Sequence, residues 1–118
     1  MDKRKKILVC DDEEGVRESL HLILENHCDL DFASSGNEAI EKIKDGNFDV
    51  LILDIKMPVK DGLETLEEIQ NIYPKLKVII ATGYQSVEMA SKAVKLGAID
   101  YITKPFERDE VLEKVNKI

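Results

Sequence analysis

The residues of this chain that could carry out chemistry stand where short apolar runs end. Asp54 follows four consecutive aliphatic residues, and Asp11 and Asp12 follow an earlier apolar run. Thr82 and Lys104 stand at the ends of two later runs. An aspartate after a strand most often starts a turn, and a threonine or lysine there is usually a turn residue or a solvated side chain. The set becomes informative only if the fold brings its members together.

The apolar runs also predict the strands that would hold these residues. Residues 7–10, 50–53 and 78–81 are continuously apolar, as in central strands of a parallel sheet that is covered on both faces. Residues 29–33 and 98–102 alternate between polar and apolar side chains, which is typical of edge strands.

Apolar side chains recur at helical spacing between these strands and after the last one. Helices are expected after residues 11–14, at 37–44, at 63–73, at 86–96, and from residue 108 onward. The side chains expected to face the sheet are Val16, Leu20, Ile23, Leu24, Ala39, Ile40, Ile43, Leu63, Leu66, Ile69, Ile72, Ala90, Ala93, Val94, Val111, Leu112 and Val115. Strands and helices that alternate, joined by right-handed crossovers, predict an α/β fold. Its sheet would be a single doubly wound, five-stranded parallel sheet of the flavodoxin-like order 2-1-3-4-5.

This strand order makes the first and third strands neighbours, so Asp11 and Asp12 would stand beside Asp54. Two carboxylates about 4 Å apart repel each other by roughly 4 kcal/mol at an effective dielectric of about 20, so the cluster favours a bound cation. Oxygen ligands with room for water suit Mg²⁺ better than Ca²⁺. Acidic residues at a helix start also cap free N–H groups, which could be the whole role of Glu13 and Glu14.

Thr82 and Lys104 would point into the same cleft, because they too lie at the carboxyl ends of strands. They would add a hydroxyl donor and a cation to the carboxylate cluster. A carboxylate nucleophile can accept a phosphoryl group to form an aspartyl-phosphate, while Mg²⁺ and a lysine offset the charge on the transferring oxygens. These residue types therefore predict phosphoryl transfer to an aspartate.

Five motifs stand in a consistent order at the expected strand ends. They are Asp11-Asp12, Asp54 with residues 55–62, Thr82-Gly83, Tyr101, and the Lys104-Pro105-Phe106 segment. Together they resemble the receiver domain of bacterial two-component response regulators. The resemblance extends over almost the whole chain and implies one receiver (phosphoacceptor) domain at residues 1–118.

The resemblance implies a role for each motif at the cleft. Asp54 would be the phosphoacceptor. Mg²⁺ would be held by Asp11, Asp12, Asp54 and the backbone carbonyl of Lys56. Lys104 would pair with the phosphoryl group, and the peptide between Lys104 and the following proline would be cis.

The resemblance also implies a conformational switch. Thr82 would move to the phosphoryl group on activation, and Tyr101 would swing inward behind it. The side chains of Lys56 and Tyr84 would flank the path of the water that hydrolyses the acyl phosphate. Our hypothesis is that these two bulky side chains slow dephosphorylation.

The implied function is that of a signalling switch, not of an enzyme with its own substrate. A partner histidine kinase would phosphorylate Asp54, and the new charge would shift a two-state equilibrium. The change would be read at the face formed by the fourth helix, the fifth strand and the fifth helix, which carries Tyr101 and Met89. An output domain or a downstream protein would bind there.

Other classes of protein fit the motifs less well. A Mg²⁺-dependent aspartyl phosphatase would use similar groups, but enzymes resembling haloacid dehalogenases carry a D-x-D pattern that Asp11-Asp12-Glu13 does not reproduce. A flavin-binding module would need a glycine-rich phosphate loop after the first strand, where four acidic residues would repel the ligand. A receiver-like binding module that never takes phosphate is disfavoured by the complete set of key residues.

The composition limits the partners and the location that we expect for this chain. Its 118 residues carry a net charge of -7, which argues against nucleic-acid binding by this domain. No apolar run approaches the roughly 20 residues of a membrane span, so we expect a cytoplasmic protein without membrane contact. Cys10 and Cys28 lack metal-binding spacing. They are expected to be buried thiols at opposite edges of the sheet, too far apart for a disulfide.

Overall fold

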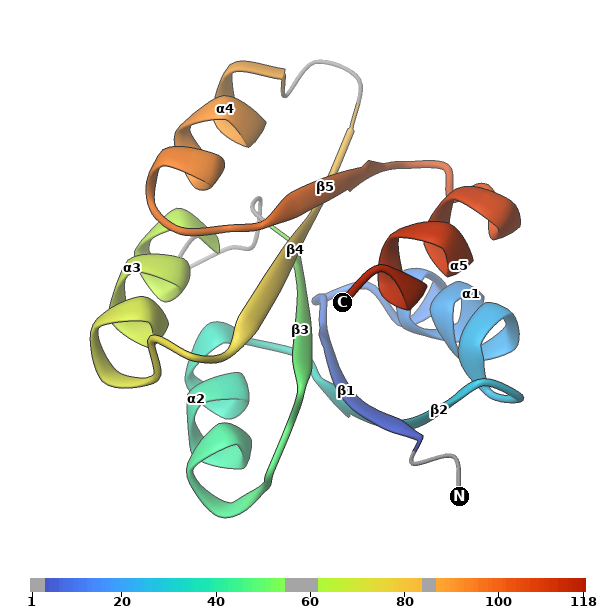
Figure 1. Ribbon diagram of the computed structural model, residues 1–118, viewed down its shortest axis with the longest axis horizontal. Coiled ribbons are helices and arrows are strands. Elements are labelled where there is room, and N and C mark those ends of the chain that lie inside the picture. The colour runs from blue at the N-terminus through green and yellow to red at the C-terminus, as the bar shows by residue number, and fades with distance from the viewer. Residues whose placement is uncertain (1–3, 55–61, 84–86) are drawn as a thin grey trace.

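The computed structural model describes residues 4–54, 62–83 and 87–118. Within these ranges five strands alternate with five helices (Figure 1). The strands are β1 (Lys5–Cys10), β2 (Cys28–Ala33), β3 (Val50–Asp54), β4 (Lys77–Thr82) and β5 (Asp100–Thr103). The helices are α1 (Glu14–Leu24), α2 (Gly36–Asp45), α3 (Gly62–Ile72), α4 (Val87–Lys95) and α5 (Arg108–Asn116).

The strands form one parallel sheet in the order β2-β1-β3-β4-β5. Both the predicted order and the two predicted edge strands are therefore confirmed. The chain leaves β1 toward one edge of the sheet and returns to β3 on its other side, so the carboxyl ends of β1 and β3 form the topological switch point. In the pairing of β1 with β3, Ile7 lies opposite Val50 and Cys10 lies opposite Leu53. The next residue after each of these last two, Asp11 and Asp54, therefore starts from the same level of the sheet.

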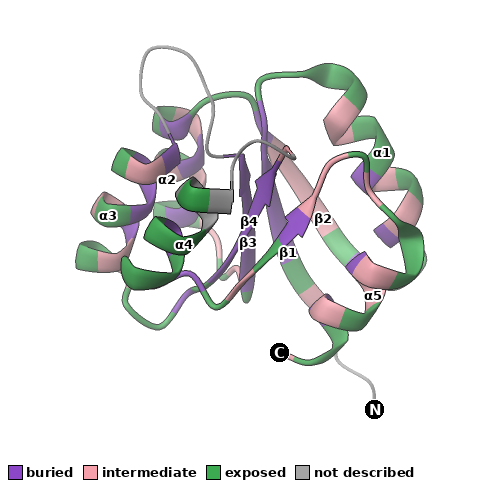
Figure 2. Cartoon of the chain, turned by 90° about the horizontal axis from the view of Figure 1, so that it is seen from above, coloured by how far each residue is buried: buried purple, intermediate pink, exposed green. Residues whose placement is uncertain are grey.

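Helices cover both faces of the sheet, with α1 and α5 on one face and α2, α3 and α4 on the other (Figures 1 and 2). Successive residues of a strand point to opposite faces. Ile7 and Val9 therefore pack with α1 and α5, whereas Leu8 and Cys10 pack with the other three helices. Every residue of β3 is buried, as its continuous apolar run predicts.

The described side chains of the predicted helix faces are buried or partly buried, with two exceptions. Ile72 is 53% exposed and Val94 is 47% exposed, so the expectation that they face the sheet is wrong. Ile72 is the last residue of α3 and lies beside the segment that leads to β4. Ala93 is fully buried, and a helix turns by about 100° per residue, which carries Val94 away from the sheet. The predicted burial of Ala90 lies outside the described side chains.

The two cysteines are buried thiols that are not joined in a disulfide, as predicted. Cys28 pairs with Lys5 at the amino edge of the sheet, and Cys10 pairs with Ala33 at the carboxyl edge. Among the described residues, no helix has both the length and the apolar character that a bilayer crossing requires.

Candidate functional site

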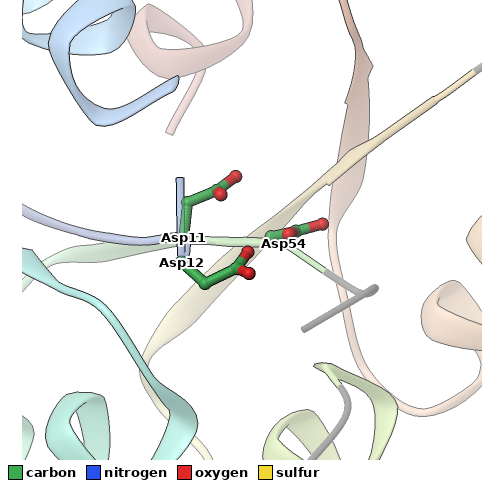
Figure 3. A group of neighbouring side chains, drawn as sticks. All are labelled: Asp11, Asp12 and Asp54. Carbon is green, nitrogen blue, oxygen red and sulfur yellow. The ribbon is translucent and has the colours of Figure 1, made fainter. Parts of the chain in front are cut away.

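Three aspartates meet at the carboxyl ends of β1 and β3 (Figure 3). Asp11 and Asp54 are buried, with 1% and 3% of their surface exposed, and Asp12 is exposed. One carboxylate oxygen from each residue lies within 4.8 Å of the other two. The structure thus brings together the three carboxylates that the sequence assigns to one pocket.

Backbone contacts hold the first of these aspartates in place. The Asp11 N–H donates to the carbonyl of Ala33, which extends the pairing of β1 with β2 by one residue. The Asp11 carboxylate accepts a hydrogen bond from the Glu13 N–H at 2.9 Å, as expected of an acidic residue before a helix. The Arg17 guanidinium donates to the Asp11 carbonyl at 2.7 Å. Arg17 was not predicted as a site residue, although its place on the first turns of α1 is a signal that could have identified it.

Lys104 contacts two of the three carboxylates. Its Nζ lies 3.0 Å from Asp11 Oδ2 and 3.4 Å from Asp54 Oδ1. The Lys104 N–H donates to the carbonyl of Thr82, so pairing with the end of β4 fixes where the lysine leaves β5. The peptide between Lys104 and Pro105 is cis, as predicted.

Burial and the contacts within the site shift the pKa values of Asp11 and Lys104. Burial raises the pKa of Asp11, the hydrogen bonds from the Glu13 N–H and from Lys104 lower it, and the net shift is upward. Burial lowers the pKa of Lys104, but contact with Asp11 and the charge of Asp54 reverse the effect, so its pKa is raised. Lys104 is therefore a stable cation beside the carboxylates.

Thr82 and Tyr101 belong to the neighbouring strands. Thr82 is the last residue of β4, is 3% exposed, and follows Ala81, which pairs with Asp54. Its hydroxyl donates to the Gly83 carbonyl at 3.3 Å. Tyr101 is 38% exposed, and the Lys114 Nζ lies 4.9 Å from the centre of its ring. Thr82 thus lies next to the carboxylates, whereas the Tyr101 side chain faces outward in this structure.

Three expectations concern parts of the chain that the structure does not describe. The carbonyl of Lys56 and the side chain of Tyr84 lie outside residues 4–54, 62–83 and 87–118. The side chain of Met89, in α4, is likewise outside the described atoms. Their roles remain predictions.

Cys10 lies beside the site but is not a nucleophile. Burial and the charges of Asp11 and Asp54 raise the pKa of its thiol to about 12. The thiol donates to the carbonyl of Ser35 at 3.3 Å. It is therefore protonated at neutral pH, in agreement with its expected role as a buried thiol.

Residues 7–116 match the family model of the response regulator receiver domain. The chain belongs to this family. The receiver domain is 37% identical over 115 residues to chemotaxis protein CheY of Halobacterium salinarum. The alignment covers 97% of this chain and 96% of that protein. It is 38% identical over 111 residues to regulatory protein AtoC of Escherichia coli, covering 90% of this chain but 23% of AtoC. The crystal structure of the NtrX receiver domain from Brucella abortus has a TM-score of 0.91 and 32% identity, over 94% of this chain and 95% of that one.

Proposed function

We propose that this receiver domain, residues 1–118, is a signalling switch that accepts a phosphoryl group on Asp54 from a histidine kinase. The observation that carries the proposal is the meeting of Asp11, Asp12 and Asp54, with Lys104 in contact with two of them. A buried carboxylate at a strand end, beside a cation and further acidic groups, can act as the nucleophile in phosphoryl transfer.

In the proposed step an oxygen of Asp54 attacks the phosphorus of a phosphohistidine. The new O–P bond forms as the P–N bond of the donor breaks, and the electron pair of that bond leaves with the imidazole. Lys104 pairs with the oxygens of the phosphoryl group, on which negative charge is concentrated. Hydrolysis of the aspartyl-phosphate later returns the carboxylate and releases inorganic phosphate.

The residues of the site fit a magnesium ion. Three carboxylates and one lysine ammonium leave a formal charge of about -2, which one divalent cation would neutralise. All the side-chain donors are oxygens, which favours a hard ion. Asp11, Asp12 and Asp54 would hold Mg²⁺, together with the predicted carbonyl ligand of Lys56. When bound, Mg²⁺ would offset charge on the transferring oxygens.

The proposed output is a change at the face formed by α4, β5 and α5. Thr82 would bind the phosphoryl group through its hydroxyl, and Tyr101 would turn inward. Exposed apolar side chains near this face support the proposal, because a partner or an output domain could cover Val94, Ile99 and Tyr101. The relatives include both CheY and the much longer AtoC, so either kind of partner is compatible with the family.

The proposed role is that of a phosphoprotein that assists its own phosphorylation and dephosphorylation, without a separate substrate. The net charge of -7 favours protein partners over nucleic acid. We place the protein in the cytoplasm, with the kinase that supplies its phosphoryl group.

The proposal can be tested by incubating the protein with acetyl phosphate, with and without Mg²⁺, and measuring its intact mass. We expect a gain of one phosphoryl group that requires Mg²⁺ and is absent in Asp54→Asn. A variant of an exposed acidic residue, Glu113→Gln, serves as the matched control and should still gain the group.

Two results would contradict the proposal. If Asp54→Asn gained the group as the wild type does, another residue would be the acceptor. If the wild type released phosphate over many cycles without accumulating the phosphorylated form, the protein would be a phosphatase instead of a switch.

A further inference from the structure

A second concave surface lies at the opposite edge of the sheet from the carboxylates. It is a groove of about 920 Å³ lined by residues 43, 44 and 46–49, at the end of α2 and before β3, and by residues 72–77, between α3 and β4. Arg4 and Lys5, at the start of β1, also line it. Because β1, β3 and β4 begin here and the aspartates stand at the far ends of β1 and β3, the length of the strands separates the two sites (Figure 1).

The floor of this groove is apolar. Ile43 and Leu76 are buried beneath it, and Phe48 and Tyr73 are partly buried and pack against the same core. Ile72 lines the groove with 53% of its surface exposed. Water therefore contacts apolar side chains that continue directly into the hydrophobic core, which favours covering them with another apolar group.

The rim of the groove is basic, although the chain as a whole is acidic. The charged side chains of the lining are Arg4, four lysines and one carboxylate, Asp49, which together carry a net charge of +4, in a chain whose net charge is -7. Lys44, Lys75 and Lys77 are exposed, and none of them makes an ion pair with any residue that the structure describes. Unpaired cations around an apolar floor are complementary to a ligand that is both acidic and apolar.

We propose that this groove docks an acidic peptide segment of a partner protein. An apolar side chain of the segment packs on Ile72, Phe48 and Tyr73, and carboxylates on either side reach Lys44 and Lys75. The volume falls at the upper end of the roughly 300–1,000 Å³ of typical ligand sites, and the groove is open to solvent between two loops, so it suits a chain segment. Docking here leaves the phosphoacceptor site and the face of α4, β5 and α5 free, and it does not depend on the proposed function.

The experiment starts by selecting displayed random peptides of about 12 residues on the wild-type protein. Peptides that combine Asp or Glu with Leu, Ile or Phe should be enriched. A synthetic peptide from this pool should shift the amide signals of residues 43–49, 72, 73 and 75–77 in NMR spectra of the protein. Its affinity should fall when salt screens the exposed charges.

Variants test the basic rim and the apolar floor of the groove separately. Lys44→Glu/Lys75→Glu should weaken the peptide at least about tenfold by reversing the charge of the rim, and Ile72→Ser should weaken it by removing the apolar contact. All three side chains are exposed, so these variants are expected to fold. Lys92→Glu/Lys95→Glu makes the same charge change on α4 and should leave the affinity within about twofold.

Several outcomes would overturn the proposal. These are enriched peptides without acidic residues, equal weakening by the control variant, or amide shifts confined to α4, β5 and α5. Self-association of the wild type that Lys44→Glu/Lys75→Glu abolishes would show that a second copy occupies the groove. Octanoate that binds as tightly as the peptide would show that the groove takes a small amphiphilic anion.

Discussion

Lys104 is the residue that allows two buried carboxylates to share the end of this sheet. Its Nζ lies 3.0 Å from Asp11 and 3.4 Å from Asp54, and its side chain is 23% exposed. Removing one member of a partly buried ion pair leaves the other member desolvated and without compensation. Here the loss would leave two carboxylates that repel each other.

We therefore expect Lys104→Met to lower the free energy of unfolding by about 3 kcal/mol in the absence of Mg²⁺. Added Mg²⁺ should restore more stability to the variant than to the wild type, because the metal would replace the lost positive charge. Urea unfolding with and without Mg²⁺ measures both effects.

Lys95→Met, an exposed change on α4, is the control and should alter stability by less than about 0.5 kcal/mol. If Mg²⁺ stabilised Lys104→Met and the wild type equally, Lys104 would not act as the counterion of this cluster.

At the scale of elements, α2 approaches α3 closely at one glycine. A Cβ atom built on Gly36 would lie 2.3 Å from the Thr65 hydroxyl oxygen, and Thr65 is fully buried. Gly36 is the first residue of α2, directly after Ser35, whose hydroxyl accepts a hydrogen bond from the Glu38 N–H. The glycine thus permits a helix start that is both capped and in contact with its neighbour.

We expect Gly36→Ala to destabilise the protein by about 1–3 kcal/mol, because the new methyl group overpacks the contact with Thr65. Gly15→Ala is the matched control in α1, where a Cβ meets nothing within 4 Å. It should stabilise by up to about 1 kcal/mol through helix propensity. Thermal and urea unfolding would contradict this interpretation if the two variants shifted stability alike.

A second contact links α2 to β2 and should depend on pH. Lys42 Nζ lies 3.0 Å from Asp31 and 3.9 Å from Glu38. Burial raises the pKa of Asp31, but the hydrogen bond from Lys42 and that from the Phe32 N–H outweigh it, and the net pKa is lowered. Hydrogen bonds from the N–H and hydroxyl of Ser34, followed by the charge of Lys42, lower the pKa of Glu38.

The unfolded-state pKa values of Asp31 and Glu38 are about 3.9 and 4.3. Because the pKa of each carboxylate is lowered in the folded state, its contribution to stability is complete above its unfolded-state pKa. That contribution is lost as the pH falls through the folded-state pKa. Lys42→Met should therefore lower stability by about 0.2–1 kcal/mol at neutral pH, and the difference should shrink below about pH 4. Unfolding curves from pH 3 to 7 test this. Lys44→Met, on the same helix, should show no such pH dependence.

At the scale of the whole molecule, two adjacent strands connect the carboxylates to the proposed output face. Thr82 of β4 pairs with Thr103 of β5, and Ile80 pairs with Tyr101. A displacement of Thr82 toward Asp54 would thus be transmitted through paired backbone to the strand that carries Tyr101. Coupling of this kind requires an element with two arrangements that both sites bias.

We expect phosphorylation to change the environment of Tyr101 in the wild type but not in Thr82→Ala, although the variant should still gain the phosphoryl group by mass. Fluorine NMR of fluorotyrosine-labelled protein reports the change, with the Tyr101 signal assigned from Tyr101→Phe. Thr82→Ser keeps the hydroxyl and should behave as the wild type. An unchanged Tyr101 response in Thr82→Ala would mean that the coupling does not pass through Thr82.

The sequence alone determined the strand order, the edge strands and the gathering of Asp11, Asp12 and Asp54. It could do so because continuous and alternating apolar runs report directly how many faces of a strand are covered. In addition, the carboxyl ends of parallel strands share one edge, so residues at strand ends are grouped by topology before any side chain is placed.

Only the tertiary structure decided which of these side chains touch, and what lies elsewhere on the surface. Lys104 contacts Asp11 across 93 residues of sequence, and no spacing rule reports such a pair. Periodicity marked Ile72 as a core residue, yet it does not tell where a helix ends relative to the sheet, and Ile72 is exposed in a basic groove. Contacts between distant residues depend on register, helix placement and side-chain conformation, which are settled only when the whole chain packs.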